Sequence, residues 1–386
     1  MITHASTIPR NASVMPALRS VVTHTGASAA SASTRLGHDR ESRINLARRL
    51  ADIMGWSYEG DYNASVEYAN PTYFIPQDAL LSTDAAALGI RGPEHFFGGV
   101  VPHAFIATKA ITHPLIHHDA AAPEGWSHAF SEWAGDSVLH GYTTFSREDA
   151  LLAATLLLRE GPVRIKCVNG IGGSGQQLVT DAQEIESALA WLDAAEFNVH
   201  GVAIEQHLDD NATFSVGRVE CNGETIAYCG TQRTVINAHG NEVYGGSTID
   251  VIRGGFDTLL QSGLTDDRHA AVDLARAYDT AAFTAYPGAF ASRRNYDVLF
   301  GLDGRGRRRT GVLEQSWRIG GASGAELVAF DVFRRDRSRT RVRCATVEIY
   351  DDKCALPPNA FVYYRGIDDH AGPLTKYAIE IDGHDA

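Results

Sequence analysis

Apolar residues recur at helical spacing in several long stretches of the chain, and the shorter apolar runs between them have the length of strands. The long stretches predict helices at residues 39–53, 146–158, 180–195 and 266–284. The short runs predict strands at residues 73–76, 98–102, 162–168, 176–179, 199–205, 214–221, 225–232, 296–302 and 310–317. Helices beside strands that run largely antiparallel indicate the α+β class.

The two ends of the chain have patterns of their own. Residues 1–38 are rich in Ser, Ala and Thr and contain one short apolar pair, Val21-Val22, that predicts a strand. Helix and strand signals alternate after it, so we expect a small α/β domain over residues 1–105. Strand-like runs around two adjacent prolines predict a β-rich segment over residues 334–386.

Composition and charge narrow the classes of function. The 386 residues are 44% hydrophobic and 21% charged, as in a globular protein, and no apolar run is long enough to span a membrane. The net charge of −13 disfavours nucleic acid and anionic membranes as partners. No secretory signal is evident, and the five cysteines lack metal or redox spacing, which favours free thiols in a reducing cytoplasm. The oligomeric state stays open.

The most informative stretch runs from Gly161 to Val179. Lys166 lies on a predicted strand, and a glycine-rich loop follows it within a few residues. The residues of that loop that we assign to ligand binding are Gly170, Gly172, Gly173, Ser174 and Gly175. Glycines let backbone N–H groups approach an anion without a Cβ in the way, and a lysine beside them adds a positive charge. The combination is typical of a phosphate-binding loop.

Several interpretations of this loop compete. Residues 170–175 match the G-x-G-x-x-G pattern, but that dinucleotide motif requires a helix directly afterwards, whereas residues 176–179 have an extended pattern. The Walker motif places its lysine after the glycines, whereas Lys166 precedes them. A hairpin lid that folds over triphosphate oxygens fits better, and an ordinary glycine-rich turn is the remaining alternative.

A second signal comes from a predicted hairpin whose turn lies at residues 303–306. If the turn is centred between its last two residues, positions whose numbers sum to 611 face each other, which places Asp297 opposite Glu314. Ser316 and Arg318 follow on the same face of the strand. Two carboxylates and a hydroxyl suit Mg²⁺ that is held jointly with nucleotide phosphates. The alternative is a surface hairpin with incidental charges.

Taken in order, these residues resemble the ATP-grasp superfamily over roughly residues 105–333, and more narrowly an uncharacterised bacterial family within it. The resemblance implies that Lys109 and Lys166 contact nucleotide phosphates beneath the glycine lid. It also matches the Glu-x-x-Leu segment at residues 205–208 to the hinge that grips adenine. The nucleotide contacts implied there are Glu205, Gln206 and Leu208.

The resemblance also assigns roles within the hairpin. The superfamily's metal site is an Asp on one strand and Glu-x-Asn on the next, and this chain has residues at the same three places: Asp297, Glu314 and Ser316. Ser316 in place of Asn is a departure from the pattern. Thr213 stands where a ribose-binding carboxylate is common, so Asp209 or Asp210 would have to substitute for it.

The chemistry implied by the resemblance is phosphorylation of a carboxylate by ATP with Mg²⁺, which gives an acyl phosphate that an amine or another nucleophile attacks. Arg318, with Arg294 or Arg233 as alternatives, would stabilise the acyl phosphate or a tetrahedral oxyanion. The expected partners are a small-molecule carboxylate and an amine. A catalytically weak ATP-binding scaffold and a biotin-carboxylase-like enzyme are the alternatives.

The implied organisation has four parts. A small domain at residues 1–105 precedes an ATP-grasp subdomain with the lid at 106–203, a subdomain with the metal site at 204–333, and a β-rich extension at 334–386. We expect a long loop after residue 232, in which Gly245–Thr248 is the candidate wall for the substrate.

Overall fold

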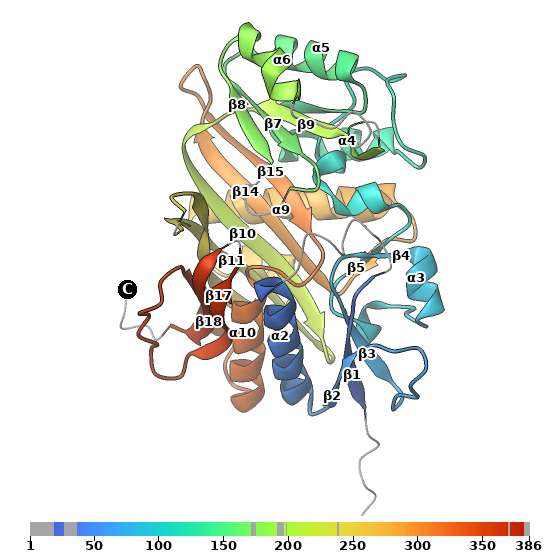
Figure 1. The fold of residues 1–386 in the computed structure, drawn as a ribbon, viewed down its shortest axis with the longest axis vertical. Helices are drawn as coiled ribbons and strands as arrows, with labels where there is room; N and C mark the ends of the chain where they lie inside the picture. The colour runs from blue at the N-terminus through green and yellow to red at the C-terminus, as the bar shows by residue number, and fades with distance from the viewer. Residues whose placement is uncertain are drawn as a thin grey trace, which may run out of the picture.

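The computed structural model describes residues 19–26, 37–170, 175–190, 197, 199–237, 239–369 and 371–381. These residues form four sheets with helices packed against them. Figure 1 shows a small sheet at the top and the long strands of a central sheet across the middle. Below them lie helices α2 (His38–Met54) and α10 (Ser323–Arg335), side by side. The mixture of helices and largely antiparallel strands confirms the predicted α+β class.

The N-terminal part contains two three-stranded sheets. The first is parallel and has the order β2-β1-β3, from Ser57–Asp61, Ser20–His24 and Thr72–Pro76. The second has the order β13-β5-β4, from Phe290–Ala291, Gly99–Val101 and Leu80–Leu81. Short helical turns lie around them: α3 (Ser82–Ala87) and η1 (Pro93–His95). The second of these sheets takes one short strand, β13, from much later in the chain.

The small sheet at the top of Figure 1 is antiparallel and has the order β6-β9-β7-β8. Its strands are Gly141–Thr144, Val202–Gln206, Val163–Cys167 and Gln176–Val179. Helices α5 (Arg147–Leu157) and α6 (Ala182–Ala190) pack on it. The preceding segment consists of η2 (Ala104–Ala107), η3 (Lys109–Thr112), α4 (His128–Ala134) and η4 (Gly135–Ser137).

The central sheet has eight strands in the order β15-β14-β10-β11-β12-β16-β18-β17, and every neighbouring pair is antiparallel. The strands span Arg308–Ser316, Arg293–Leu302, Asp209–Cys221, Glu224–Ile236, Glu242–Arg253, Arg341–Ile349, Gly372–Glu380 and Phe361–Asp368. The residues predicted as a β-rich extension thus form strands that continue the central sheet.

The two faces of the central sheet carry different helices. Helix α9 (Asp266–Ala285), with α8 (Phe256–Leu260) beside it, covers one face through a core that includes Val216, Tyr296 and Val298. Helices α10 and α2 cover part of the other face through a core that includes Val219 and Ile249. Because side chains alternate along a strand, residues 293, 295 and 297 of β14 point to the α10 face, and residues 294, 296 and 298 point to α9.

Two predicted elements differ from the structure. The segment expected to be a loop around Gly245 is strand β12, because Gly246 lets two strands approach closely: a Cβ there would lie 2.1 Å from the carbonyl oxygen of Thr346. The strand expected from residue 199 begins at Val202, since residues 199 and 200 are helical. The helix predicted over 180–195 is described as far as Ala190.

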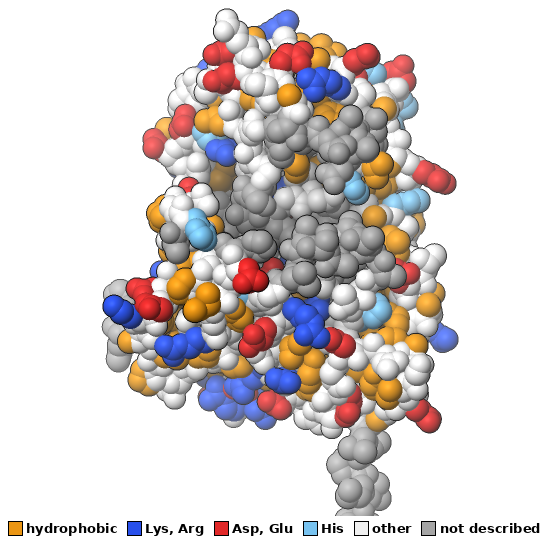
Figure 2. All heavy atoms as spheres, in the orientation of Figure 1, with side chains coloured by type: hydrophobic (Ala, Val, Ile, Leu, Met, Phe, Trp, Pro, Cys, Tyr) orange, Lys and Arg blue, Asp and Glu red, His pale blue; other side chains and the backbone are white. Residues whose placement is uncertain are grey.

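The surface carries charges of both signs. Figure 2 shows Lys and Arg side chains interspersed with Asp and Glu side chains over one face. The arginine-rich run at residues 334–343 is largely ion-paired, in the pairs Arg334–Asp331, Arg335–Asp331, Arg337–Glu224, Arg339–Glu380 and Arg341–Asp250. These pairs balance much of the positive charge of the run within the protein.

Candidate functional site

The glycine loop is flanked by two antiparallel strands, as the lid interpretation requires. Lys166 on β7 pairs with Gln176 on β8, and the Cys167 N–H donates to the Gly175 carbonyl at 2.8 Å. Gly175 has a φ of 69°, a conformation that favours glycine. A strand rather than a helix follows the loop, which argues against the dinucleotide motif. Gly172, Gly173 and Ser174 lie outside the described residues.

Lys109 connects the base of this loop to the central sheet. It lies on η3, which contacts β15 and β9, and its side chain is buried. Its Nζ donates to the Gly170 carbonyl and lies 2.8 Å from Oε2 of Glu314. One ammonium group therefore contacts both the predicted phosphate loop and the predicted metal site.

Lys166 is paired within the small sheet. Its Nζ forms an ion pair with Oε1 of Glu205 on β9, and Nε2 of His113 lies 2.9 Å from the other carboxylate oxygen. All three side chains are buried. Burial opposes ionisation of Glu205, but the charge of Lys166 and the hydrogen bond with His113 prevail and lower its pKa to about 2. The Glu205 carboxylate thus orients Lys166.

The predicted hinge joins the two sheets. Strand β9 ends at Gln206 and β10 begins at Asp209, so residues 207–208 are the connection. Gln206 is partly exposed, whereas Leu208 is buried and its carbonyl accepts a hydrogen bond from Asn211 at 2.9 Å. Asp210 is exposed, with a φ of 45°, where the pairing of β10 with β14 is interrupted.

Strands β14 and β15 bring the two predicted metal ligands together. Asp297 lies directly opposite Glu314, as predicted, and Ser316 lies opposite Asn295. The register between β14 and β15 shifts near the site because Leu313 is an extra residue in β15. Beyond this bulge the paired numbers sum to 610, since the turn is centred on Arg305 rather than between residues 305 and 306. The bulge restores the predicted register where the acids lie.

The acid pair has an uneven set of partners. Lys109 contacts Glu314, whereas Asp297 accepts a hydrogen bond from Nε2 of Gln232 at 2.6 Å. Burial and the neighbouring Glu314 charge raise the pKa of Asp297 to about 7, against the opposing effects of Gln232, Lys109 and Arg293. A carboxyl with such a pKa is only partly ionised near neutral pH, and a divalent cation between the two acids would favour the ionised form.

The donor set suits a hard cation that also binds phosphate. Two carboxylates and the Ser316 hydroxyl provide oxygen ligands on neighbouring positions of one sheet face. Within the described part of the chain, no group of three or more His, Cys, Asp or Glu side chains could hold a metal ion by itself. Mg²⁺ commonly takes one or two protein carboxylates together with substrate phosphates and waters, so the residues present fit Mg²⁺ with a nucleotide.

The three candidate catalytic arginines lie in different places. Arg318 follows β15 and pairs with Asp78 of the N-terminal part at 3.4 Å. Arg294 points to the opposite face of β14, where it pairs with Asp279 at 3.0 Å. Arg233 is exposed and donates from Nε to the Gly245 carbonyl at 3.0 Å. Arg318 lies on the acid pair's side of the sheet, whereas alternation turns the side chain of Arg294 to the opposite face. Arg318 therefore stays the leading candidate of the three.

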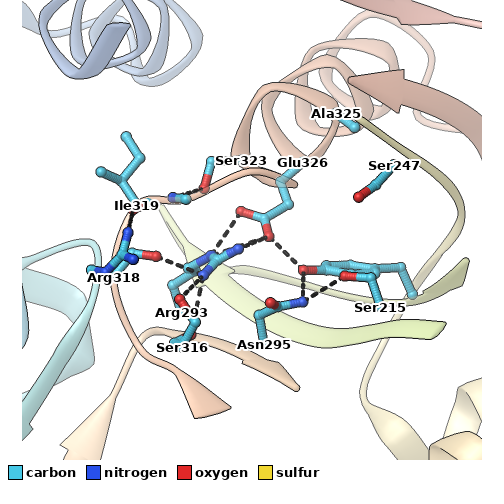
Figure 3. Close-up of polar contacts among 12 residues, drawn as sticks. Ser215, Ser247, Arg293, Asn295, Ser316, Arg318, Ile319, Ser323, Ala325 and Glu326 are labelled. Atoms are coloured by element: carbon cyan, nitrogen blue, oxygen red, sulfur yellow. Dashed lines mark hydrogen bonds and ion pairs between the residues drawn. The ribbon is translucent and has the colours of Figure 1, made fainter. Parts of the chain in front are cut away.

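A buried polar network that we did not predict lies beneath the site (Figure 3). Arg293 pairs with Glu326 of α10 at 2.8 Å, and the Tyr228 hydroxyl donates to the same carboxylate at 2.6 Å. Asn295 donates from Nδ2 to Ser215 at 2.8 Å and to the Tyr228 hydroxyl at 3.1 Å. Side chains at every second position of a strand share a face, so the position of Asp297 could have placed Arg293 and Asn295 on this face.

Ser247 of the predicted substrate wall is buried on β12 and contacts the Tyr244 hydroxyl at 2.5 Å.

The arrangement of sheets is shared with solved ATP-grasp enzymes. The N5-carboxyaminoimidazole synthetase of Staphylococcus aureus, solved with ADP, matches with a TM-score of 0.54 at 10% identity, over 94% of this chain and 93% of that one. An ADP complex of N5-carboxyaminoimidazole ribonucleotide synthetase matches with a TM-score of 0.51 at 12% identity, over 96% and 94%. At these identities the likeness establishes the fold: this chain has the ATP-grasp fold.

A third match is the biotin carboxylase domain of 2-oxoglutarate carboxylase from Hydrogenobacter thermophilus, solved with MgADP and bicarbonate. Its TM-score is 0.50 at 13% identity, over 94% of this chain and 86% of that one.

The chain belongs to the family described as protein of unknown function (DUF3182), whose model matches residues 26–378. A comparison with curated proteins gives no match. Among the described residues, no helix is both long and apolar enough to cross a membrane.

Proposed function

We propose that this protein is an ATP- and Mg²⁺-dependent ligase that activates a carboxylate as an acyl phosphate for attack by an amine or a similar nucleophile. The observation that carries the proposal is the position of Lys109, whose Nζ contacts Gly170 at the base of the loop and Glu314 of the acid pair. A triphosphate bound beneath the loop would place its terminal phosphates beside these groups. The ATP-grasp fold agrees with this interpretation.

Each residue has a role that follows from its chemistry. Lys109 and Lys166 would neutralise phosphate charge, and Gln206 and Leu208 are the candidate contacts for the adenine where the two sheets join. Asp297, Glu314 and Ser316 would hold Mg²⁺, which would offset the negative charge that develops during transfer. Asp210 is the candidate contact for the ribose.

Two bond exchanges complete the reaction. An oxygen of the substrate carboxylate bonds to the γ-phosphorus as the bond to the ADP oxygen breaks, which gives an acyl phosphate. The amine nitrogen then bonds to the acyl carbon, phosphate departs with the carbon–oxygen bonding pair, and the amine loses a proton. Arg318 would stabilise the oxyanion that forms on the acyl carbon during the second step.

Ser316 supports a second candidate function, that of an ATP-binding scaffold. Its hydroxyl already accepts a hydrogen bond from Nη1 of Arg293 at 3.3 Å, and serine reaches less far than the asparagine usual at this place. A protein that binds ATP and scaffolds partners, with weak catalysis or none, would tolerate such a site.

Two measurements test the proposal in sequence. Thermal denaturation with ATP and limiting Mg²⁺ should show a stabilisation of the wild type that is strongly reduced in Asp297→Asn. Asp257→Asn, which changes an exposed acid paired with Arg276, is the matched control and should keep the stabilisation. Absence of stabilisation in the wild type would refute ATP binding altogether.

Release of ADP is then measured with a panel of carboxylates and amines, bicarbonate included. Release that requires both a carboxylate and an amine supports the ligase. Release with bicarbonate alone supports the carboxylase-like alternative. Binding of ATP without stimulated release by any pair supports the scaffold.

A further inference from the structure

The main-chain pairing between β14 and β15 ends beside the candidate metal site. Its last pair is Asn295 with Ser316; in the same register the ladder would next join Arg294 to Trp317 and then Arg293 to Arg318. Strand β15 stops at Ser316, so neither of these pairs forms through the main chain. One proposed functional side chain, Ser316, ends the ladder, and another, Arg318, lies just beyond it.

The side chain of Arg293 forms the link to residue 318 that the main chain does not form. Its Nη1 donates to the carbonyl of Arg318 at 2.6 Å, and to the carbonyl and the hydroxyl of Ser316 at 3.1 and 3.3 Å. The Nη1 group has two N–H bonds for three acceptors, so one of them is shared. Hydrogen bonds from a charged donor are stronger than neutral ones, and the planar guanidinium fixes their direction. Figure 3 shows the contacts to Ser316 and Arg318 at the same end of the guanidinium, with Glu326 at its other edge.

Glu326 holds the other edge of the guanidinium. The Nε of Arg293 lies 3.1 Å from each carboxylate oxygen, and Nη2 lies 2.8 Å from Oε1. The two side chains are 1% and 0% exposed, respectively. A third donor, the hydroxyl of Tyr228, completes the surroundings of the carboxylate. The pair is neutral as a unit, so Arg293 orients its neighbours without adding net charge beside the acid pair.

The position of Arg318 shows what this arrangement controls. Gly320 lies close to all three groups. A Cβ added at Gly320 would lie 3.6 Å from Ser316 Oγ and 3.7 Å from the Nη1 atoms of Arg293 and Arg318. The hydroxyl and both guanidinium groups therefore border one small region at the end of β15. A shift of the backbone at residues 316–318 would move the hydroxyl and the Arg318 guanidinium together.

We propose that Arg293, fixed by Glu326, is a positioning residue that holds Ser316 and Arg318 in line with the acid pair. The proposal rests on the proposed function for the roles of those two residues. It also assigns a purpose to a buried ion pair, which by itself is weak evidence for stability. Helix α10 thereby becomes part of the support for the site.

The test begins with the double variant Arg293→Met with Glu326→Leu. Replacing both partners of a buried pair by apolar side chains is often neutral for stability, so we expect a folded protein by circular dichroism. Hydrogen–deuterium exchange of a peptide covering residues 317–322 should become about tenfold faster or more, because several charge-assisted bonds are lost. Arg294→Met, next in sequence but on the other face, should leave that exchange unchanged. Unchanged exchange in the folded double variant would overturn the proposal.

The second readout is the Mg²⁺ concentration that gives half of the full stabilisation by ATP. We expect it to rise about tenfold in the double variant, the effect of losing about one good ligand interaction. Adding Ser316→Ala should then produce little further change, because that hydroxyl is already displaced. Full additivity of the two changes would contradict the proposal.

Two further outcomes are also decisive. If the double variant fails to fold, Arg293→Lys replaces it, since lysine keeps the charge opposite Glu326 but loses the planar fork, and the same two results are required of it. If the wild type shows no stabilisation by ATP with Mg²⁺, the proposed function is refuted. The exchange measurement still decides whether Arg293 positions residues 316–318.

Discussion

The two lysines of the candidate site are balanced in different ways. Lys166 faces a single carboxylate, Glu205, and a histidine completes a closed, buried group. Lys109 faces one acid of a pair, Glu314, and leaves Asp297 with an amide as its hydrogen-bonding partner. The result is a pKa lowered to about 2 at Glu205 and raised to about 7 at Asp297.

The Lys166–Glu205 group is preorganised, whereas the acid pair Asp297 and Glu314 would be stabilised by a bound ligand. The charges around Lys166 are satisfied within the protein, so removing one of them leaves a buried charge without its partner. The acids on β14 and β15 repel each other within the protein, so a bound cation would improve their interaction. The predictions below test this contrast, from the largest expected effect to the smallest.

Lys166→Met should lower the free energy of unfolding by about 3–5 kcal/mol, because it leaves the buried Glu205 carboxylate without its cation. Denaturant unfolding followed by circular dichroism measures the loss. Lys353→Met, at an exposed lysine, is the matched control and should stay within about 0.5 kcal/mol of wild type. Similar losses in both variants would show that the Lys166 group is not special.

Asp297→Asn should have the opposite effect on the protein without ligand. Removing one of two neighbouring negative charges should leave stability at pH 8 unchanged or raise it by about 1 kcal/mol. The same change should raise the Mg²⁺ requirement for nucleotide binding at least about tenfold, because a ligand is lost. Isothermal titration with ADP at several Mg²⁺ concentrations measures the requirement. A loss of stability as large as that of Lys166→Met would contradict the contrast.

The pH dependence of stability should reflect Asp297 between about pH 4 and pH 7. Its pKa is raised from 3.8 to about 7, so the folded state retains a proton that the unfolded state has released. Its contribution is therefore present below about pH 4 and is lost as pH rises through 7, by up to about 1.4 kcal/mol per pH unit. Unfolding of wild type and Asp297→Asn across this range should show the slope only in wild type.

Glu205 acts in the opposite direction and in a lower range. Its pKa is lowered from 4.5 to about 2, so its contribution is present above pH 4.5 and is lost as pH falls towards 2. Asp297→Asn should leave this acid limb unchanged. A variant that altered both limbs would show that the two groups are coupled.

Arg294→Ala should have the smallest effect. It removes an ion pair with Asp279 and a contact with the Phe283 ring, whose centroid lies 4.4 Å from the guanidinium, at a cost of about 1 kcal/mol. Nucleotide binding with Mg²⁺ should stay as in wild type, because the side chain lies on the α9 face.

Arg318→Ala, compared with Arg294→Ala in the ADP-release assay, should leave the fold intact and reduce the rate of ADP release. Equal rates in the two variants would remove Arg318 from the proposed mechanism.

The sequence predicted the acid pair because strand pairing follows simple arithmetic. Asp297 and Glu314 face each other as expected, although the turn is centred half a residue earlier and the bulge at Leu313 corrects the register. A bulge depends on the surrounding structure and has no clear signature in this stretch. The strand after the glycine loop was predicted for a similar reason, since residues 176–179 have a strand pattern and form β8.

Other features depend on contacts between distant parts of the chain. Glycine is uncommon within strands, so the stretch around Gly246 predicted a loop, yet close approach to Thr346 requires glycine within β12. Residues 293 and 294 are both arginines. Only their spacing from Asp297 along the strand shows that Arg293 points to the same face as Asp297 and that Arg294 points to the other. The role of Arg293 further depends on Glu326, which comes from a helix 33 residues later.

The position of β18 has a consequence for how the chain folds during synthesis. This strand follows β17 in the chain, at Gly372–Glu380, and pairs on one side with β16 and on the other with β17. Strand β17 therefore emerges from the ribosome before the neighbour that attaches it to the sheet. The small sheet that bears Lys166 can assemble early, whereas the central sheet is completed only after β18 has been made.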